Sequence, residues 1–324
     1  GYEVRFQGPP GEYSARASRL DVPATNRVAS SGAVEISFER ILPLPSVADF
    51  DGNGLKDIFL ISDRRLLVFL QEEKGVLRAE PSLTLKADLH RSQEGAGRVV
   101  NVALWVCDVN ADSRADVVSF VAEGSLAELE NMTSSALLFL NRGRDGFPDT
   151  PNSIINLKGM LVGSWVGDFN GDGCADLLMT SVKTDFTTAM MKYVSKQTQV
   201  DYAIHLFDKR AGGFTVSPGY LGQERIAAED GSLWKLLAQF NGDVDGDRIS
   251  DRVGLREKDG KTLLYARHGK RGSKPNTMAF DKKPMFEREV EKGGMLRVLD
   301  IDSDGRAELV YQTGSALNVF VVKR

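Results

Sequence analysis

The sequence predicts an all-β protein, a β-propeller of about five four-stranded blades. Three observations point to this fold class. An acidic nine-residue pattern recurs five times along the 324 residues, an apolar segment leads into each copy, and further strand-like segments follow it. Repeats of this length with about four short strands each are typical of propeller blades. Hydrophobic residues make up 42% of the chain and charged residues 27%, which is ordinary for a soluble chain that buries a large core.

The repeated pattern reads Asp, any residue, Asp or Asn, any residue, Asp or Asn, three residues and a final acid. Its copies begin at Asp49, Asp108, Asp168, Asp243 and Asp300, so successive copies start 59, 60, 75 and 57 residues apart. If each allowed class fills about a tenth of positions, chance gives a match with a probability on the order of 10⁻⁴ per starting point. Five copies therefore indicate true internal repetition.

The strands of each unit follow in a constant order. The segments that enter the loops read LPSVA, NVALWVC, LVGSWVG, LLAQFNG and MLRVL, and those that leave them read IFLIS, VVSFV, LLMTS, RVGLR and LVYQT. A third strand pattern comes next, and a looser fourth completes most units. The 75-residue spacing predicts an insertion at residues 185–200, and residues 124–135 form a smaller one at the equivalent place in the second unit.

The last unit supplies only three strands before the final residue of the sequence. We expect residues 32–44 to provide its missing outer strand and to close the ring. This interpretation divides the chain into an N-terminal arm, residues 1–31, and a single propeller domain, residues 32–324. The alternatives are a degenerate extra blade in residues 1–48, which leads to six or seven blades, and a chain that forms part of a larger ring.

The acidic loops have the chemistry of calcium sites. Calcium is a hard cation that takes six to eight oxygen ligands from flexible, carboxylate-rich loops. Acids or amides at loop positions 1, 3 and 5 place three side-chain oxygens on one concave side, and the acid at position 9 closes the shell. We therefore predict up to five Ca²⁺ ions. The predicted ligands are Asp49, Asp51, Asn53 and Asp57; Asp108, Asn110, Asp112 and Asp116; Asp168, Asn170, Asp172 and Asp176; Asp243, Asp245, Asp247 and Asp251; and Asp300, Asp302, Asp304 and Glu308.

An EF-hand is the main alternative, because its loop also begins Asp-x-Asp-x-Asp-Gly. That motif requires a Glu at loop position 12 and helices on both sides. The loops are flanked by strand patterns, and position 12 is occupied by Leu60, Ser119, Met179, Gly254 and Tyr311. A second alternative is that the loops are only polar turns, since Asp, Asn and Gly favour turns. The second loop fits the calcium interpretation least well, because Ala111 and Ser113 replace glycines.

These loops and their flanking strands resemble FG-GAP/VCBS repeats, the units of integrin-alpha-type β-propellers, over about residues 40–324. The resemblance implies that each loop joins the innermost strand of a blade to the second strand and holds one calcium ion. Such propellers usually have about seven blades, whereas this chain accounts for five. Members of this family serve in adhesion, as fungal lectins, as surface or toxin-associated modules and in polysaccharide-processing proteins, so the resemblance names no ligand.

The sequence predicts a binding module and no enzyme. The metalloprotease, serine-hydrolase, P-loop and dinucleotide-binding motifs are all missing, and His90, His205 and His268 are scattered. We expect a calcium-stabilised adhesion or binding module that is secreted, periplasmic or on the cell surface. It would present residues 123–135 or 185–200 to a protein or glycan. The alternative is a non-catalytic or catalytic propeller domain of a polysaccharide-processing enzyme or toxin assembly.

Charge and the remaining motifs refine the expected partner. The chain has 41 lysines and arginines, four of them within the five loops, and 28 acidic residues outside the loops; the basic residues are densest at 267–283. This stretch is either a solvated hairpin or a contact for an anionic partner. No interleaved aromatics predict specific binding of nucleic acid, and no apolar run reaches the roughly 18 residues of a transmembrane segment.

Two side-chain types leave alternatives open. Trp105, Trp165 and Trp234 could stack on sugar rings or pack in the core. Cys107 lies at a strand end and Cys174 within a loop, so a disulfide and two free thiols both remain open.

Overall fold

The computed structural model describes residues 2–6, 17–22, 25–31, 35–41, 45–62, 65–86, 99–125, 128–158, 160–182, 197–227 and 237–322. Within these ranges all regular secondary structure is β-strand, apart from one short 3₁₀ turn, Gly143–Asp145. The predicted all-β class is therefore confirmed. The chain forms two compact units, one of Gly1–Gln93, Val102–Phe120 and Leu137–Asn152, the other of Glu94–Asn101, Val121–Ala136 and Ser153–Arg324. No helix of the described residues is long and apolar enough to cross a bilayer.

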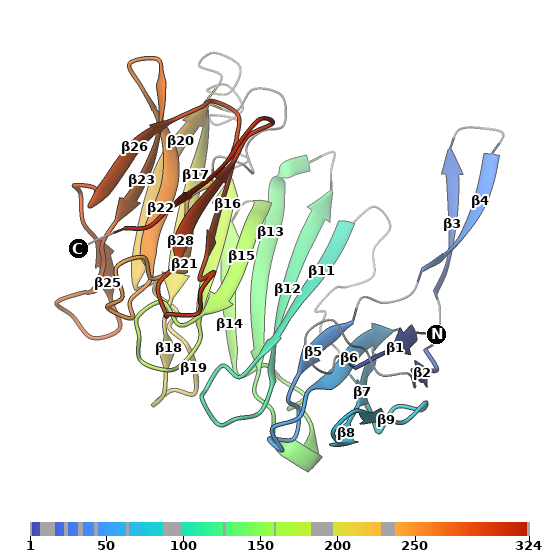
Figure 1. Cartoon of the computed structure of the whole chain (residues 1–324). Helices are drawn as coiled ribbons and strands as arrows, with labels where there is room; N and C mark the ends of the chain where they lie inside the picture. The colour runs from blue at the N-terminus through green and yellow to red at the C-terminus, as the bar shows by residue number, and fades with distance from the viewer. Residues whose placement is uncertain are drawn as a thin grey trace. The chain divides into compact units, whose positions relative to one another are not determined.

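The first unit contains a four-stranded antiparallel sheet in the order β10-β7-β6-β5, of which β5, β6 and β7 are labelled in Figure 1. Its strands are β5 (Ser46–Ala48), β6 (Asp57–Ser62), β7 (Arg65–Phe69) and β10 (Leu83–Lys86). Three hairpins accompany it: β1 (Tyr2–Val4) with β2 (Ser18–Leu20), β3 (Thr25–Ser31) with β4 (Glu35–Ile41), and β8 (Gln71–Glu73) with β9 (Val76–Leu77). The sheet buries Leu60, Leu67 and Phe69.

The second sheet contributes residues to both units and has the order β11-β12-β13-β14. Its strands are β11 (Val99–Cys107), β12 (Asp116–Ser125), β13 (Glu128–Phe139) and β14 (Ser153–Lys158). The insertion expected at residues 124–135 extends β12 and β13, so it is strand over most of its length.

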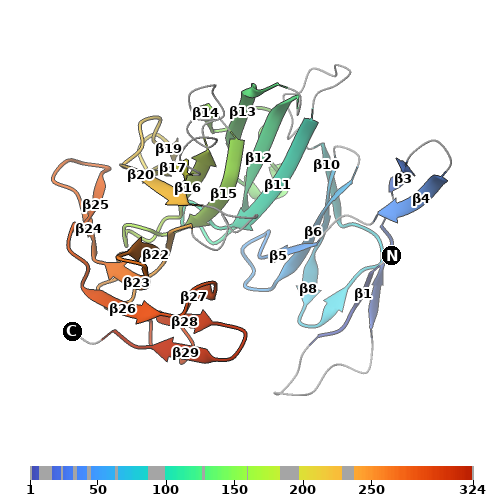
Figure 2. The same ribbon diagram turned by 90° about the horizontal axis from the view of Figure 1, so that it is seen from above.

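The second unit contains three further sheets, in the orders β15-β16-β17-β20, β21-β22-β23-β26 and β27-β28-β29 (Figure 2). The third sheet is built from β15 (Met160–Gly167), β16 (Asp176–Val182), β17 (Gln197–His205) and β20 (Tyr220–Ala227). The fourth is built from β21 (Gln239–Gly242), β22 (Asp251–Lys258), β23 (Lys261–Arg267) and β26 (Phe286–Val290). The fifth contains β27 (Met295–Leu299), β28 (Glu308–Gln312) and β29 (Leu317–Phe320). Two small hairpins accompany these sheets: β18 (Phe207–Asp208) pairs with β19 (Gly213–Phe214), and β24 (Gly269–Arg271) pairs with β25 (Met278–Phe280).

Each large sheet is thus built from strands of one repeat, as in a propeller blade. Neighbouring sheets of the second unit pack face to face through apolar side chains. Phe240 of β21 packs with Val162, Leu178 and Ile204 of the third sheet, and Leu264 of the fourth sheet shares a core with residues of the fifth. Burying one such side chain stabilises the fold by roughly 1.5–3 kcal/mol. The number of blades in a closed ring stays a prediction.

The strand expected to close the ring has a different partner. Residues 35–41 form β4 and pair with β3 from Thr25↔Ile41 to Ser31↔Glu35, while the described part of the fifth sheet has three strands. The short link between β3 and β4 explains this pairing, because closing a small loop costs less chain entropy than a long-range contact. The hairpin joins residues on both sides of the predicted boundary between residues 31 and 32, and the division into arm and propeller domain stays a prediction.

Candidate functional site

All five acidic loops occupy the same place in their sheets. They join β5 to β6, β11 to β12, β15 to β16, β21 to β22, and β27 to β28, which are the first and second strands of the five large sheets. The acid at loop position 9 is in every case the first residue of the second strand: Asp57, Asp116, Asp176, Asp251 and Glu308. The loop placement implied by the family resemblance is therefore the one observed.

The first Asp of a loop organises the turn around itself. In the first loop the two carboxylate oxygens of Asp49 accept N–H bonds from Gly52, at 2.8 Å, and from Gly54, at 2.7 Å. Asp168 does the same in the third loop with Gly171 and Gly173, at 2.7 and 2.8 Å. These bonds curl the backbone so that the other polar side chains of the loop converge on one side.

Loop positions 4 and 6 adopt positive φ in all five loops. Glycines occupy both positions in the first and third loops. In the second loop Ala111 and Ser113 take the same conformation, with φ of 63° and 71°, and Arg248 and Ser303 do so in the fourth and fifth. The second loop therefore has the shared geometry despite its missing glycines. Positive φ costs a non-glycine residue roughly 1–2 kcal/mol.

The structure brings several predicted ligands together. In three of the loops, three carboxylates lie close enough to share one ion: within each group, one oxygen from each residue lies within 4.8 Å of the other two. The groups are Asp49, Asp51 and Asp57; Asp243, Asp245 and Asp251; and Asp300, Asp302 and Asp304. In the second and third loops an asparagine stands at position 3, and the amides of Asn110 and Asn170 donate to the position-5 carboxylates at 3.2 and 3.0 Å. The assignment of the twenty residues as ligands stays a prediction.

The position-9 carboxylate is buried and connects the loop to its sheet. In the third sheet Asp176 accepts N–H bonds from Phe169 of the loop, at 3.0 Å, and from Phe207 beyond the third strand, at 2.8 Å. Burial raises the pKa of Asp176 to about 8, despite these hydrogen bonds, and the nearby Asp172 and Asp168 raise it further.

Burial likewise raises the pKa of Asp116 and of Asp251 to about 7, and it raises the pKa of Asp57. Carboxylates gathered in this way repel one another and favour either a proton or a cation. A divalent ion with oxygen ligands fits this donor set, because calcium takes its ligands from carboxylates and carbonyls.

Backbone hydrogen bonds link successive loops within each unit. The position-8 amide of one loop donates to a carbonyl at position 1 or 2 of the preceding loop. The pairs are Ala115 N to Asp49 O, at 2.6 Å, Ser250 N to Phe169 O, at 3.0 Å, and Ala307 N to Asp243 O, at 2.7 Å. Ordering one loop therefore also orders a hydrogen-bonding partner of the next.

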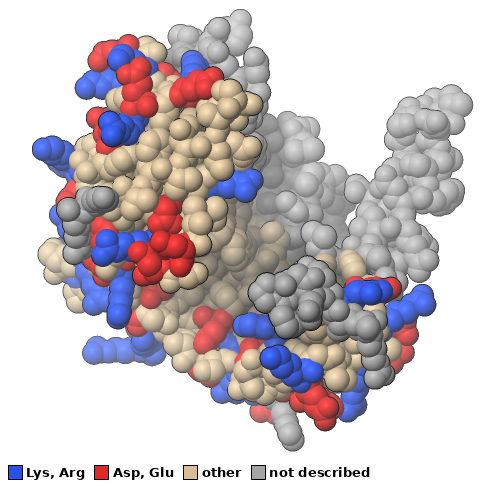
Figure 3. Space-filling model, viewed as in Figure 1, with Lys and Arg blue, Asp and Glu red and all other residues tan. Residues whose placement is uncertain are grey.

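Part of the basic stretch 267–283 serves this loop system. Arg271 donates to the carbonyls of Asn170 and Gly171, at 2.9 Å each, and so holds the third loop from a neighbouring sheet. Lys270 forms an ion pair with Asp281. On the face shown in Figure 3, basic and acidic side chains are interspersed.

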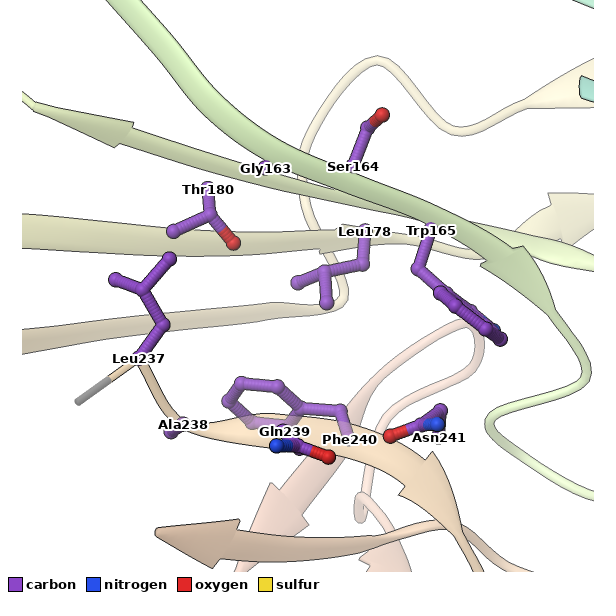
Figure 4. A pocket seen from close by; sticks show the side chains of 10 residues that line it. All are labelled: Gly163, Ser164, Trp165, Leu178, Thr180, Leu237, Ala238, Gln239, Phe240 and Asn241. Atoms are coloured by element: carbon purple, nitrogen blue, oxygen red, sulfur yellow. The ribbon is translucent and has the colours of Figure 1, made fainter. Parts of the chain in front are cut away.

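A cavity of about 230 Å³ lies between the third and fourth sheets of the second unit (Figure 4). Leu178 and Phe240 are buried beneath it, and Trp165 stands at its edge with 40% of its surface exposed. Cross-strand pairing explains this arrangement, because Trp165↔Leu178 and Gly163↔Thr180 are direct partners in β15 and β16. Ser164 points to the other side of the strand (Figure 4).

Two glycines lie on the strand that borders this cavity. A methyl group on Gly163 would be in ordinary contact with Thr180, at 3.6 Å, so the wall has room for one there. Gly167 lies beneath the indole of Trp165, since a methyl group there would be 3.2 Å from Nε1. Sequence reasoning singled out Trp165 but left its role open, and no sequence signal connected it with Phe240.

Other residues singled out in the sequence have simpler environments. Cys107 and Cys174 are free cysteines, and burial raises the pKa of Cys107 to about 12. Trp105 is half-buried. Trp234, His90 and residues 185–196 lie outside the described residues, while residues 197–200 belong to β17.

Comparison with known proteins identifies the repeats. A model of the FG-GAP-like repeat matches residues 49–119 and 108–179, so this part of the chain carries FG-GAP-like repeats. No curated protein sequence matches the chain.

Several solved structures are similar at low identity. An Agrocybe aegerita lectin that recognises non-reducing terminal N-acetylglucosamine is 14% identical, with 88% of this chain and 81% of that one covered and a TM-score of 0.34. The exotype rhamnogalacturonan lyase YesX is 15% identical, with 80% and 47% covered and a TM-score of 0.39. The V. cholerae biofilm matrix protein Bap1 is 13% identical, with 98% and 58% covered and a TM-score of 0.27.

Proposed function

From the premise that residues 49–179 carry FG-GAP-like repeats, we propose that the protein is a non-enzymatic, calcium-stabilised module that binds a glycan at the Trp165 cavity. The observation that carries this proposal is the exposure of Trp165 beside a buried apolar floor. A large aromatic side chain usually gains stability by burial, so a tryptophan with 40% of its surface exposed at the edge of a cavity suits a ligand.

A sugar ring matches this cavity chemically. One face of a pyranose is made of C–H groups and can lie on an indole, while its hydroxyls need hydrogen-bonding partners around the edge. Thr180 and Asn241 place a hydroxyl and an amide in the lining; in Figure 4 Asn241 lies near the indole and Thr180 lies at the other end of the cavity, by Leu237. At about 230 Å³ the cavity is smaller than the roughly 300–1,000 Å³ of drug-sized sites, so it suits a single ring.

Calcium would have a structural role in this module. The carboxylates and amides at positions 1, 3 and 5 and the buried acid at position 9 would hold each ion, and the ion would supply the positive charge that offsets the repulsion between the carboxylates. At a free calcium concentration 100 times the dissociation constant, one site adds about 2.7 kcal/mol to stability. We place the protein outside the cytoplasm, where calcium-binding modules of millimolar to submillimolar affinity remain loaded.

The test is binding of the purified, calcium-loaded chain to a panel of neutral and acidic glycans, followed by titration calorimetry with each ligand found. We expect Trp165→Ala to weaken binding about tenfold or more, because it removes the stacking surface. Gly163→Ala, which adds a methyl group to the wall, should weaken binding with little loss of stability. Leu221→Ala is the matched control, since Leu221 is 63% exposed on another strand of the same sheet.

Two results would contradict the proposal. Equal affinities of the wild type and Trp165→Ala would remove the cavity as the binding site. Release of a cleaved product from an acidic glycan would favour the alternative, a catalytic propeller domain of a polysaccharide-processing enzyme.

A further inference from the structure

We propose that the fourth acidic loop is a mixed nitrogen and oxygen site for a borderline divalent metal of the zinc class, with His268 as the nitrogen ligand. This inference rests on the proposal that the acidic loops hold cations, and it assigns a different ion to one of them. His268 Nδ1 lies 3.1 Å from Asp245 Oδ2, and Nε2 lies 3.8 Å from Asp247 Oδ2. One ligand atom from each of these three residues lies within 4.8 Å of the others.

The internal repeats show that a histidine is unusual at this place. In each of the first four repeats, a backbone N–H that comes after the third strand donates to the position-9 acid. The donors are Gln71, Asn141, Phe207 and Gly269, which are therefore equivalent positions. The residues directly before them, also equivalent, are Leu70, Leu140, Leu206 and His268. Three repeats therefore have a leucine at this position, and the fourth has a histidine.

The backbone on both sides holds His268 in place. The amide of the next residue, Gly269, donates to Asp251 Oδ1 at 2.8 Å, and the carbonyl of His268 accepts the amide of Asp281 at 2.9 Å. Two hydrogen bonds thus fix the backbone from which the imidazole projects.

The nitrogen that faces the loop lies among carboxylate oxygens. His268 Nδ1 is itself shielded from solvent and makes no hydrogen bond in the described structure, while the whole side chain of His268 is 30% exposed and that of its ion-pair partner Asp245 is 8% exposed. Asp251 Oδ1 lies 4.0 Å from the same nitrogen. A metal ion between the imidazole and these carboxylates would satisfy the nitrogen lone pair and the oxygens together.

The type of donor decides which ion this site prefers. Calcium takes oxygen ligands almost exclusively, whereas imidazole nitrogen suits zinc, copper, iron and nickel. Zinc is commonly held by four ligands drawn from His, Cys, Asp and Glu. The fourth loop contains an oxygen set, Asp243, Asp245 and Asp251, and a mixed set, Asp245, Asp247 and His268, which share Asp245. The ion therefore depends on whether His268 takes part.

The experiment counts bound ions by native mass spectrometry and measures zinc affinity by titration calorimetry on the full chain, first stripped with chelator and then saturated with calcium. We expect one zinc ion to bind the wild type. His268→Leu, which installs the residue of the other repeats, should lower zinc affinity at least tenfold while the calcium count is kept or raised. Its melting temperature in chelator should match that of the wild type, which controls for folding.

A gain-of-site variant makes the test independent of any loss of folding. The pair Leu309↔Phe320 in the fifth sheet corresponds to Arg252↔Arg267 in the fourth, so Val321 is the equivalent of His268. The fifth loop also has acids at positions 1, 3 and 5. Val321→His should therefore create a second zinc site, and Val321→Gln should not.

Equal zinc affinity in the wild type and His268→Leu would overturn the inference. So would a wild type that binds no zinc, because the imidazole would then be only a neighbour of the carboxylates. The glycan-binding test with Trp165 uses calcium alone, so it succeeds or fails independently of this result.

Discussion

At the scale of single residues, two glycines of the third loop allow the cost of a positive φ to be distinguished from the cost of a steric clash. Gly171 and Gly173 both have positive φ, of 72° and 86°. A methyl group on Gly171 would lie 2.5 Å from the carbonyl oxygen of Arg248, whereas one on Gly173 would meet nothing within 4 Å. The two positions therefore share the conformational requirement and differ in available space.

We predict that Gly173→Ala lowers the free energy of unfolding by about 1–2 kcal/mol, the cost of a left-handed conformation for a non-glycine residue. Gly171→Ala should cost more, because the adjacent loop must also move. Urea denaturation in saturating calcium measures both values. Equal losses for the two variants would mean that the contact with Arg248 contributes nothing.

His205 makes stability depend on pH. Its side chain is buried, its ring nitrogen Nδ1 bonds to the carbonyl of Thr215 at 2.8 Å, and burial lowers its pKa from the ordinary value of 6.5. The folded state therefore favours the neutral ring. This contribution is complete above pH 6.5, where the unfolded chain is also neutral, and it is lost as the pH falls towards the lowered pKa of the folded state.

His205→Gln should flatten the decline of stability between about pH 6.5 and 5 relative to the wild type, since the amide can still donate but does not titrate. Denaturation midpoints across this range provide the comparison. Parallel curves for the two proteins would show that other groups account for the acid sensitivity.

At the scale of elements, the third and fourth sheets meet around a buried charge. Arg252 of β22 lies 3.0 Å from Glu224 of β20, and the two side chains are 8% and 21% exposed. The guanidinium also donates to the hydroxyl of Tyr220 at 3.1 Å, and it lies 5.5 Å from the ring centre of Tyr202. This group joins two sheets that are otherwise held together by apolar side chains.

Removing only one partner should be costly, because it leaves the other charge buried. We predict that Arg252→Met lowers the free energy of unfolding by about 3–5 kcal/mol. Combining it with Glu224→Gln should recover a large part of this loss. A double-mutant cycle by chemical denaturation measures the coupling, and strictly additive effects would exclude a functional ion pair.

At the scale of the whole molecule, the acidic loops connect metal binding with the stability of the sheets. Each loop sits between the first two strands of its sheet, and backbone bonds such as that from Ala307 to Asp243 link it to the next loop. Loss of ions should therefore weaken both the sheets and the links between them.

We predict that chelation lowers the melting temperature by at least about 5–10 °C, which corresponds to the loss of one or two sites at about 2.7 kcal/mol each. Thermal melts in calcium and in chelator, with ions counted by native mass spectrometry, check this outcome. An unchanged melting temperature with no bound ions would mean that the loops are polar turns only.

Local features of this molecule were predictable from the sequence because they depend on neighbouring residues. The five acidic patterns placed the turns between first and second strands, and the apolar segments around them marked the strands. Even the second loop takes the shared conformation, with Ala111 and Ser113 at positive φ, since the backbone amides of Asp112 and Ser113 donate to the carboxylate of Asp108. The repeating pattern alone was enough for the all-β class and for the predicted cation ligands.

Features that join distant segments were decided only by the tertiary structure. The cavity beside Trp165 needs Phe240 from another sheet, and the approach of His268 to Asp245 depends on the register of β22 and β23. The pairing of residues 35–41 with 25–31 is a further feature that the sequence pattern did not indicate. The physical reason is that turn and strand preferences act over a few residues, whereas packing and strand pairing depend on which surfaces meet after the chain has folded.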